Sequence, residues 1–178
     1  MAFITEVVSP IGTLTLAGEG ESLTGLWIAD QKYYMAGMEP SPVRRDEAAV
    51  FDQARRWLDR YFAGDWPQPG ELPLQPGGTV FQKTVWDILC RIPRGETTTY
   101  GAIAREIAAQ TGRNVSAQAV GNAVGRNPIS IIIPCHRVVG ADGSLTGYAG
   151  GIRKKQWLLD WEGVDVSRLK VPRHGTAL

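Results

Sequence analysis

The stretch Ile129-Ser130-Ile131-Ile132-Ile133-Pro134-Cys135-His136-Arg137-Val138-Val139 is the most informative part of the chain. Four of its first five residues are isoleucines, and a short β-branched run of this kind predicts a buried strand. Pro134 has no N–H to donate and is expected to end that strand. Cys135 is then predicted to lie just past a strand end, where reactive side chains are common.

The neighbours of Cys135 favour a reactive thiol, although a free cysteine is more often a buried, inert residue. His136 is a base whose pKa lies near neutrality, and Arg137 adds positive charge that favours the thiolate. Adjacent side chains of an extended chain point to opposite faces, so Cys135 and His136 touch only if the chain turns at Pro134. A bridging water is the alternative, and the sequence leaves both arrangements open.

Length and composition are those of an ordinary globular protein. The 178 residues are 43% hydrophobic and 21% charged, enough for one large or two small domains. The sequence contains no apolar run near the roughly 20 residues that span a bilayer, and its N-terminus lacks the basic start of a signal peptide. With only Cys90 and Cys135 present, we expect no disulfide framework and a cytoplasmic location.

Charge is unevenly distributed along the chain. Residues 1–78 hold six Lys and Arg against eleven Asp and Glu, a balance of −5; residues 79–178 hold thirteen against seven, a balance of +6. The Pro- and Gly-rich segment 70–78 lies at this change and is the best linker candidate. We therefore expect an N-terminal domain over 1–76, a C-terminal domain over 77–163 and a poorly ordered tail over 164–178. An anionic partner would bind the basic half, although a solvated surface explains the charge equally well.

The N-terminal domain is predicted to combine a sheet with a helix. Alternating apolar segments at residues 3–8, 13–16 and 23–28, separated by turn residues, predict a β-meander. A helix is expected over residues 47–62. Its apolar face is typical of a core and consists of Val50, Ala54, Trp57, Leu58 and Tyr61.

The C-terminal domain is predicted to be mostly helical. Capping residues, apolar periodicity and Gly and Pro positions indicate helices at residues 79–92, 100–109, 116–127 and 152–162. A short turn joins the second and third, a spacing compatible with a helix-turn-helix. That signal is weak alone, because most helix pairs of this kind bind no DNA.

Two features of the C-terminal half favour a close ligand or partner. Gly121 and Gly125 lie inside a predicted helix, where each costs about 1 kcal/mol relative to Ala, so a backbone or a groove wall is expected nearby. The basic cluster Arg153–Lys155 begins the last predicted helix, against the helix dipole, and favours an external anion.

Taken together, these segments resemble the O6-alkylguanine-DNA alkyltransferases, also called methylated-DNA–protein-cysteine methyltransferases. The resemblance runs from Ser9 to Gly163 and centres on the segment Ile131–Gly140. Further matching segments are Phe81-Gln82, Val85-Trp86, Ile92-Pro93, Gly95, Thr99-Tyr100, Ala119-Val120-Gly121, Asn127-Pro128, Gly147-Tyr148, Gly150-Gly151, Trp157-Leu158-Leu159 and Glu162-Gly163. So many segments in one order make the resemblance specific.

The resemblance implies an α/β (α+β) fold, with an N-terminal ribonuclease-H-like αβ domain before a mostly helical C-terminal domain with a helix-turn-helix. It implies DNA repair by irreversible, single-turnover transfer of the alkyl group of O6-alkylguanine, and of O4-alkylthymine, to the protein's own cysteine. The partner would be double-stranded DNA carrying O6-alkylguanine, bound in the minor groove with the lesion flipped out. A monomer without membrane contact is expected, and cooperative assembly on DNA is left open.

The resemblance also implies the residues of the reaction. Cys135 would be the acceptor nucleophile, His136 would deprotonate it through a water, Glu162 would orient His136, and Asn127 would brace the region. No cofactor and no metal are expected, because the two histidines and two cysteines lack the spacing of zinc ligands.

A second group of residues would bind the lesion and the duplex. Tyr100 would donate a hydrogen bond to the purine as guanine leaves. Backbone groups of Cys135, Val138 and Ala149 would read the guanine edge. The remaining implied contacts with substrate or DNA are Ser116, Ala117, Gln118, Ala119, Gly121, Arg137, Tyr148 and Gly150.

Two positions depart from the family pattern. Gln118 stands where an Arg usually enters the duplex, and it lacks the charge and stacking surface of Arg. We expect Gln118 to be the intruding residue still, with slower or weaker flipping. Arg94 stands where Tyr is common and is expected to contact a phosphate.

Three other functions compete with alkyl transfer. A non-catalytic lesion sensor would carry Trp in place of Cys135. A regulator that reads the major groove is disfavoured by the small, uncharged face of helix 116–127. A Cys-His hydrolase would need an oxyanion site, for which the sequence gives no clear signal.

Overall fold

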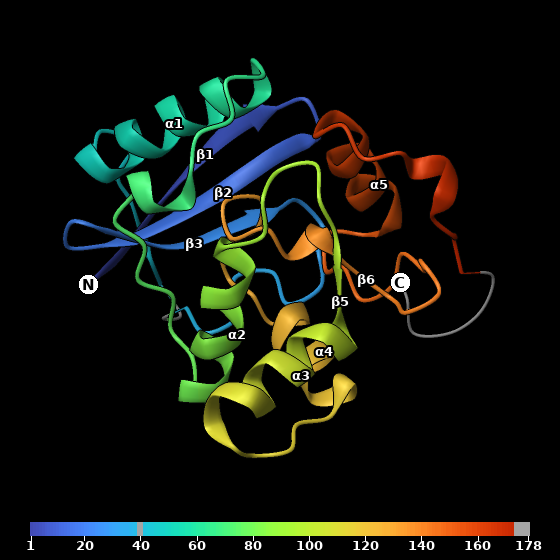
Figure 1. The fold of residues 1–178 in the computed structure, drawn as a ribbon. Helices are drawn as coiled ribbons and strands as arrows, with labels where there is room; N and C mark the ends of the chain where they lie inside the picture. The colour runs from blue at the N-terminus through green and yellow to red at the C-terminus, as the bar shows by residue number, and fades with distance from the viewer. Residues whose placement is uncertain (39–40, 173–178) are drawn as a thin grey trace. The chain divides into compact units, whose positions relative to one another are not determined.

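The computed structural model describes residues 1–38 and 41–172 (Figure 1). The chain forms two compact units, one made of Met1–Gly78 with Pro128–Ile132, the other of Thr79–Asn127 with Ile133–Leu178. The predicted combination of an N-terminal sheet domain and a helical C-terminal domain is confirmed. None of the helices within the described ranges is long and apolar enough to cross a membrane.

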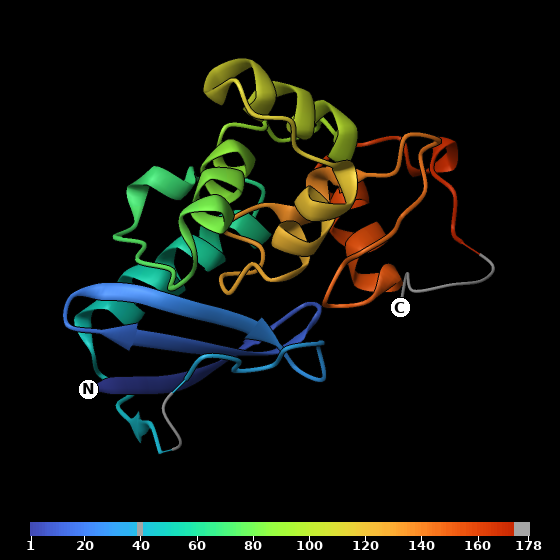
Figure 2. The ribbon, with the colours of Figure 1, turned by 90° about the horizontal axis from the view of Figure 1, so that it is seen from below.

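The first unit is built on a four-stranded sheet. Strands β1 (Ala2–Ser9), β2 (Gly12–Glu19) and β3 (Ser22–Ile28) form the predicted antiparallel meander, and β4 (Val43–Arg44) pairs in parallel with β1. Helix α1 (Ala49–Phe62) crosses one face of this sheet (Figures 1 and 2). Its buried side chains include the predicted stripe: Val50, Phe51, Ala54, Trp57, Leu58 and Tyr61.

Two segments from elsewhere in the chain pair with strand β3. Residues 73–75, within the predicted linker, exchange hydrogen bonds with Leu23, both of 2.8 Å. Residues 128–130 exchange hydrogen bonds of 2.8 and 3.0 Å with Leu26. The chain therefore leaves the second unit at Asn127 and returns to it at Ile133, a crossing that the sequence did not indicate.

The predicted strand over residues 129–133 is wrong, although these residues are buried as expected. Ile129 forms an isolated bridge with Leu26 in place of a strand, and the next residues form tight turns. Ile131 has a φ of 71°, a left-handed conformation that costs a residue with a Cβ about 1–2 kcal/mol. The pairing with Leu26 covers one residue and leaves the others to pack inward, so tertiary contacts override the β propensity of isoleucine.

The described residues of the second unit form four α-helices. These are α2 (Val80–Cys90), α3 (Tyr100–Thr111), α4 (Ala117–Gly125) and α5 (Ile152–Trp161). The predicted capping box of α2 forms: the Thr79 hydroxyl accepts from the Gln82 N–H, and the Gln82 side chain accepts from the Thr79 N–H. Trp86 donates to the Ala123 carbonyl at 2.8 Å and so ties α2 to α4.

Short elements connect these helices. Strands β5 (Thr98–Thr99) and β6 (Val138–Val139) pair in parallel, which places the start of α3 beside the segment that follows Cys135. Over residues 1–38 and 41–172 the chain also forms three 3₁₀ turns: η1 (Pro69–Glu71), η2 (Cys135–Arg137) and η3 (Val166–Arg168).

The expectation of a poorly ordered tail is wrong for residues 164–172. Val164, Val166 and Leu169 pack against an apolar cluster, and the Leu145 N–H donates to the Lys170 carbonyl at 2.8 Å. The cluster consists of Val139, Leu145, Ile152 and Leu159. Residues 173–178 of the predicted tail lie outside the described residues.

Gly25 lies under the ring of Trp27 in β3, and a Cβ at Gly25 would stand 2.1 Å from a ring carbon. Gly25→Ala must therefore displace a buried indole, and we expect it to lower the free energy of unfolding by about 1–3 kcal/mol. Urea denaturation measures the change. Gly77→Ala is the control, because a Cβ there meets no atom within 4 Å; equal midpoints for the two variants would refute the packing argument.

Candidate active site

The predicted catalytic residues gather around the turn η2. Cys135 is 5% exposed, and His136 and Glu162 are fully buried. The chain turns at Pro134 and enters η2 instead of leaving a strand, but His136 Nδ1 makes no hydrogen bond to Cys135 in the described part of the chain. Helix α5 packs on η2 and its C-cap residue is Glu162, which brings this carboxylate to the two residues after Cys135.

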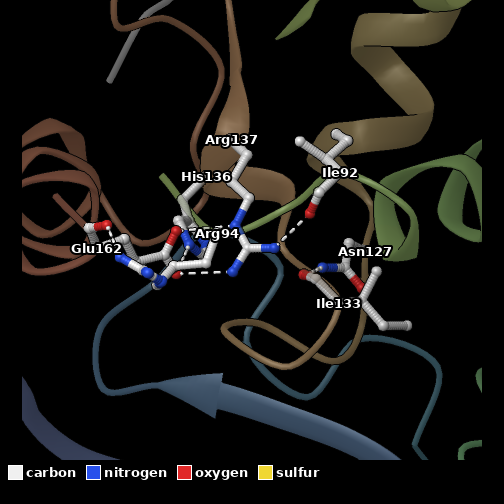
Figure 3. Close-up of polar contacts among 7 residues, drawn as sticks. All are labelled: Ile92, Arg94, Asn127, Ile133, His136, Arg137 and Glu162. Atoms are coloured by element: carbon white, nitrogen blue, oxygen red, sulfur yellow. Dashed lines mark hydrogen bonds and ion pairs between the residues drawn. The ribbon is translucent and has the colours of Figure 1, made fainter. Parts of the chain in front are cut away.

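Glu162 is held by two side chains (Figure 3). Its Oε2 lies 2.8 Å from His136 Nε2, while Arg137 donates from Nε to Oε1 at 2.8 Å and from Nη2 to Oε2 at 3.0 Å. Burial alone would raise the pKa of the Glu162 carboxyl, but His136 and Arg137 outweigh it and hold that pKa well below its usual range. Glu162 is thus an anion and can only accept hydrogen bonds.

This geometry determines which nitrogen of His136 can act as a base. Because Glu162 only accepts, the neutral imidazole must carry its proton on Nε2, which leaves a lone pair on Nδ1. Nδ1 is buried and has no hydrogen-bond partner in the described part of the chain. An oriented imidazole with one free basic nitrogen is the arrangement that activates a nucleophile.

Arg137 lies inside the site, against Glu162. The side chain is buried, and besides Glu162 it donates from Nη1 to the Ile92 carbonyl at 2.5 Å. Its guanidinium contacts indicate that Arg137 fixes and neutralises Glu162. The contact with substrate or DNA that the resemblance implied for Arg137 stays a prediction.

Asn127 supports the turn that carries Cys135. Its Nδ2 donates to the Ile133 carbonyl at 2.8 Å, which is where the crossing segment rejoins the second unit. Burial raises the pKa of the Cys135 thiol, while a hydrogen bond from Asn127 and the positive charge of Lys155 oppose that rise. The bracing position expected for Asn127 therefore extends to the sulfur itself.

Tyr100 lies at the start of α3 against the loop 146–150. Its hydroxyl donates to the Thr146 carbonyl at 2.6 Å, and burial raises its pKa to about 12, so it stays a donor at neutral pH. Gly147 has a φ of 75°, and a Cβ there would lie 2.9 Å from the Tyr100 hydroxyl oxygen. Only glycine allows this loop and Tyr100 to lie so close together.

The residues after Gly147 lie along the same loop. Tyr148 is buried, and its ring centroid is 6.4 Å from that of His136. Its hydroxyl has no hydrogen-bond partner within the described residues. Ala149 and Gly150 are half-buried beside it. Val138, the other implied contact, is buried in β6 directly after η2.

The DNA contacts implied for helix α4 include exposed residues at its start and one residue, Gly121, that faces inward. Ser116, Ala117 and Gln118 at its start are exposed, and Ala119 is half-buried. Gly121 faces inward, because a Cβ there would touch the Tyr100 ring at 3.7 Å. Gly121 therefore permits a close approach of the Tyr100 ring, and the contact with substrate or DNA that the resemblance implied for it stays a prediction.

Arg94 is exposed overall, yet its Nη1 donates to the main-chain carbonyl of Glu162 at 3.0 Å. This bond satisfies a carbonyl at the C-terminal end of α5, where positive charge is favourable. The phosphate contact expected for Arg94 stays a prediction.

Sequence analysis missed Lys155 as a member of this site. It was grouped with Arg153 and Lys154 as surface charge, but its side chain is fully buried. The signal was present in the periodicity, since Lys155 is three residues from Ile152 and from Leu158, on the buried face of α5.

The remaining titratable side chains of the described residues form no second reactive or metal-binding site. Among the described residues no cluster of three His, Cys, Asp or Glu side chains could hold a metal ion. Burial is the main reason that the pKa of Cys90 rises to about 11, so this thiol is protonated and unreactive at neutral pH.

Two protein-family models match this chain, one over the N-terminal half and one over the C-terminal half. A family model described as the ribonuclease-like domain of 6-O-methylguanine DNA methyltransferase matches residues 5–76. A second, described as the DNA binding domain of the same protein, matches residues 80–164. The two matches together span most of the chain and meet where the first unit gives way to the second.

Individual relatives agree with the family models. A methylated-DNA–protein-cysteine methyltransferase of Mycobacterium leprae is 49% identical over 155 residues, covering 86% of this chain and 88% of the relative. One from Haemophilus influenzae is 41% identical over 160 residues, with coverages of 90% and 86%. The crystal structure of Mycobacterium tuberculosis OGT in complex with DNA superposes with a TM-score of 0.78 at 44% identity, covering 94% of each chain. The chain therefore belongs to the 6-O-methylguanine DNA methyltransferase family.

Proposed function

We propose that this protein repairs DNA by moving the alkyl group of O6-alkylguanine to the Sγ atom of Cys135, once per molecule. The observation that carries the proposal is an oriented base on the residue next to Cys135. His136 is fixed through Nε2 by the Glu162 carboxylate, and its Nδ1 is buried without a partner. The family membership and the DNA-bound relative support DNA as the partner.

The first step is removal of the thiol proton. Burial raises the pKa of Cys135, so a nearby base must take the proton as the nucleophile forms. His136 Nδ1 receives it through a bridging water, and the imidazolium that results is stabilised by Glu162. Arg137 keeps Glu162 ionised, so that the carboxylate attracts the positive imidazolium.

The second step is displacement at the alkyl carbon. The thiolate attacks in line, an S–C bond forms, and the bond between that carbon and O6 breaks with its electron pair retained by guanine. Tyr100 donates a hydrogen bond to the departing purine in exchange for its bond to the Thr146 carbonyl. The product is a thioether, which neither Cys90 nor any hydrolytic pair in the site can cleave, so the protein is consumed.

Access to Cys135 requires the lesion to leave the duplex. The cysteine is 5% exposed, and the O6 substituent cannot reach a buried sulfur while guanine is stacked. The exposed residues Ser116, Ala117 and Gln118 at the start of α4 are small enough to enter a minor groove. Backbone groups of Cys135, Val138 and Ala149 would read the edge of the flipped guanine. O4-alkylthymine as a second substrate, a monomeric state and a cytoplasmic location stay predictions.

The proposal is tested by intact-mass measurement after exposure to free O6-benzylguanine. We expect one added benzyl group per molecule, located on Cys135, and no further turnover. Cys90→Ser should react like the wild type, and Cys135→Ser should remain unmodified. An unmodified wild-type protein, or a label on Cys90, would sink the proposal.

Replacement of Glu162 tests the oriented base. Glu162→Gln leaves Arg137 as a buried charge without its partner, and we expect a loss of about 3–5 kcal/mol in the free energy of unfolding. Benzyl transfer should slow at least about tenfold, because His136 loses its orientation and its stabilising charge.

The stability difference should also depend on pH. The pKa of Glu162 is depressed in the folded state, so its contribution is complete above the unfolded value of about 4.3 and is lost as the pH falls below it. Denaturation of wild type and Glu162→Gln at several pH values measures this. A difference that stays constant from neutral pH to about pH 3 would contradict the ion pair.

Gln118 is the predicted intruding residue. Gln118→Ala removes its hydrogen bond to a base edge, worth about 1 kcal/mol, so repair of a benzylated duplex should slow about fivefold. Gln118→Arg should accelerate it, because Arg adds phosphate attraction and stacking. The rate with free O6-benzylguanine is the control and should not change. Equal duplex rates for wild type and Gln118→Ala would remove Gln118 from this role.

A further inference from the structure

Lys155 is an unusual residue because its ammonium is buried without a carboxylate. The side chain has no exposed surface, and Nζ donates to two main-chain carbonyls, those of Val138 at 2.5 Å and Thr146 at 2.8 Å. No ion pair of Lys155 occurs among the described residues. A buried cation paired only with neutral dipoles is costly, so its presence calls for a compensating anion.

The two carbonyls place this ammonium in the neighbourhood of Cys135. Val138 directly follows the turn η2 that carries the thiol, and its position is fixed by the pairing of β6 with β5. The Thr146 carbonyl also accepts from the Tyr100 hydroxyl at 2.6 Å. Lys155 and Tyr100 therefore meet at one carbonyl, and the position of the ammonium is set before the thiolate forms.

The other titratable groups near the sulfur supply no free positive charge. Tyr100 and Tyr148 are neutral, since burial raises both of their pKa values. Arg137 is neutralised by Glu162 at 2.8 Å, and the same carboxylate faces His136. Within the described site, Lys155 is left as the cation without an anionic partner.

We propose that Lys155 is a positioning residue for alkyl transfer, a buried counter-charge that stabilises the Cys135 thiolate electrostatically while two carbonyls hold it in place. The proposal deepens the function above and rests on it, because a thiolate is needed only if Cys135 is the nucleophile. The cost of burying the ammonium in the resting protein is offset when the thiol loses its proton. The positive charge of Lys155 thus stabilises the reacting thiolate and does not stabilise the resting folded protein.

The charge relation is reciprocal. Burial lowers the pKa of Lys155 to about 8, and a charge on Cys135 raises it. The positive charge of Lys155 in turn lowers the pKa of Cys135 against the effect of burial. The two groups therefore titrate as a coupled pair, and removing the ammonium must make the thiol harder to ionise.

Thiolate absorbance in the ultraviolet tests this without any substrate. Lys155→Met should raise the apparent pKa of Cys135 by about one unit or more, with Cys135→Ser subtracted as the blank. Arg153→Met is the matched control, because it removes an exposed positive charge from the same turn of α5 and should leave the thiol unchanged. Lys155→Gln, which keeps a donor for one carbonyl, replaces Lys155→Met if the latter fails to fold. An unchanged pKa of Cys135 in a folded Lys155 variant overturns the proposal.

Benzyl transfer from free O6-benzylguanine supplies a second readout. At about pH 7 the Lys155→Met rate should be about tenfold lower, matching a one-unit pKa shift. The difference should narrow as the pH rises above about 8, where Lys155 gives up its proton in the wild type. A rate ratio that is the same at every pH indicates a merely structural role and refutes the counter-charge. Loss of reaction in the wild type would instead refute the proposed function and leave the thiol titration to decide the role of Lys155.

Discussion

The ionised, fully buried carboxylate of Glu162 is the constraint on which the site depends. It is tolerated inside the protein only because Arg137 and His136 both bind it, and each of these partners has its orientation set by that contact. The carboxylate comes from the end of α5 and its partners come from η2. The contacts that orient His136 for the reaction therefore also hold α5 against η2. Arg94 and Arg137 connect the same region further, because they donate hydrogen bonds to the main-chain carbonyls of Glu162 and Ile92, respectively.

The site is also built with little room for adjustment. Cys135 follows a turn that Asn127 closes, and the loop opposite passes Tyr100 at a distance that only a glycine at 147 permits. Such crowding fixes donors and bases before substrate arrives, which is how protein sites avoid reorganisation during reaction. It suits a protein that performs one transfer, because no product has to be released from the sulfur.

Sequence reasoning predicted most of the fold for physical reasons. Helix α1 and the meander have unambiguous apolar periods, and the Thr79 capping box is a local signal that tertiary contacts did not alter. The segment 129–133 misled, because β-branched residues favour strands only where a partner strand is available along their length. The burial of Arg137 and Lys155 was not foreseen for a different reason: charged residues are assumed to be exposed, and only the structure reveals a buried carboxylate partner or a pair of carbonyl acceptors.

The crossing segment 128–132 has a consequence for how the protein can be divided. Leu26 of the first unit pairs with Ile129 of this segment, while the residues on either side of the segment belong to the second unit. A fragment that begins at Thr79 would contain this apolar segment without strand β3, with which the segment pairs. Its exposed isoleucines would then promote self-association. The two family-model matches follow one another along the sequence, but the two compact units of the structure are interleaved. Neither half of the chain is therefore a natural unit for dissection or domain exchange.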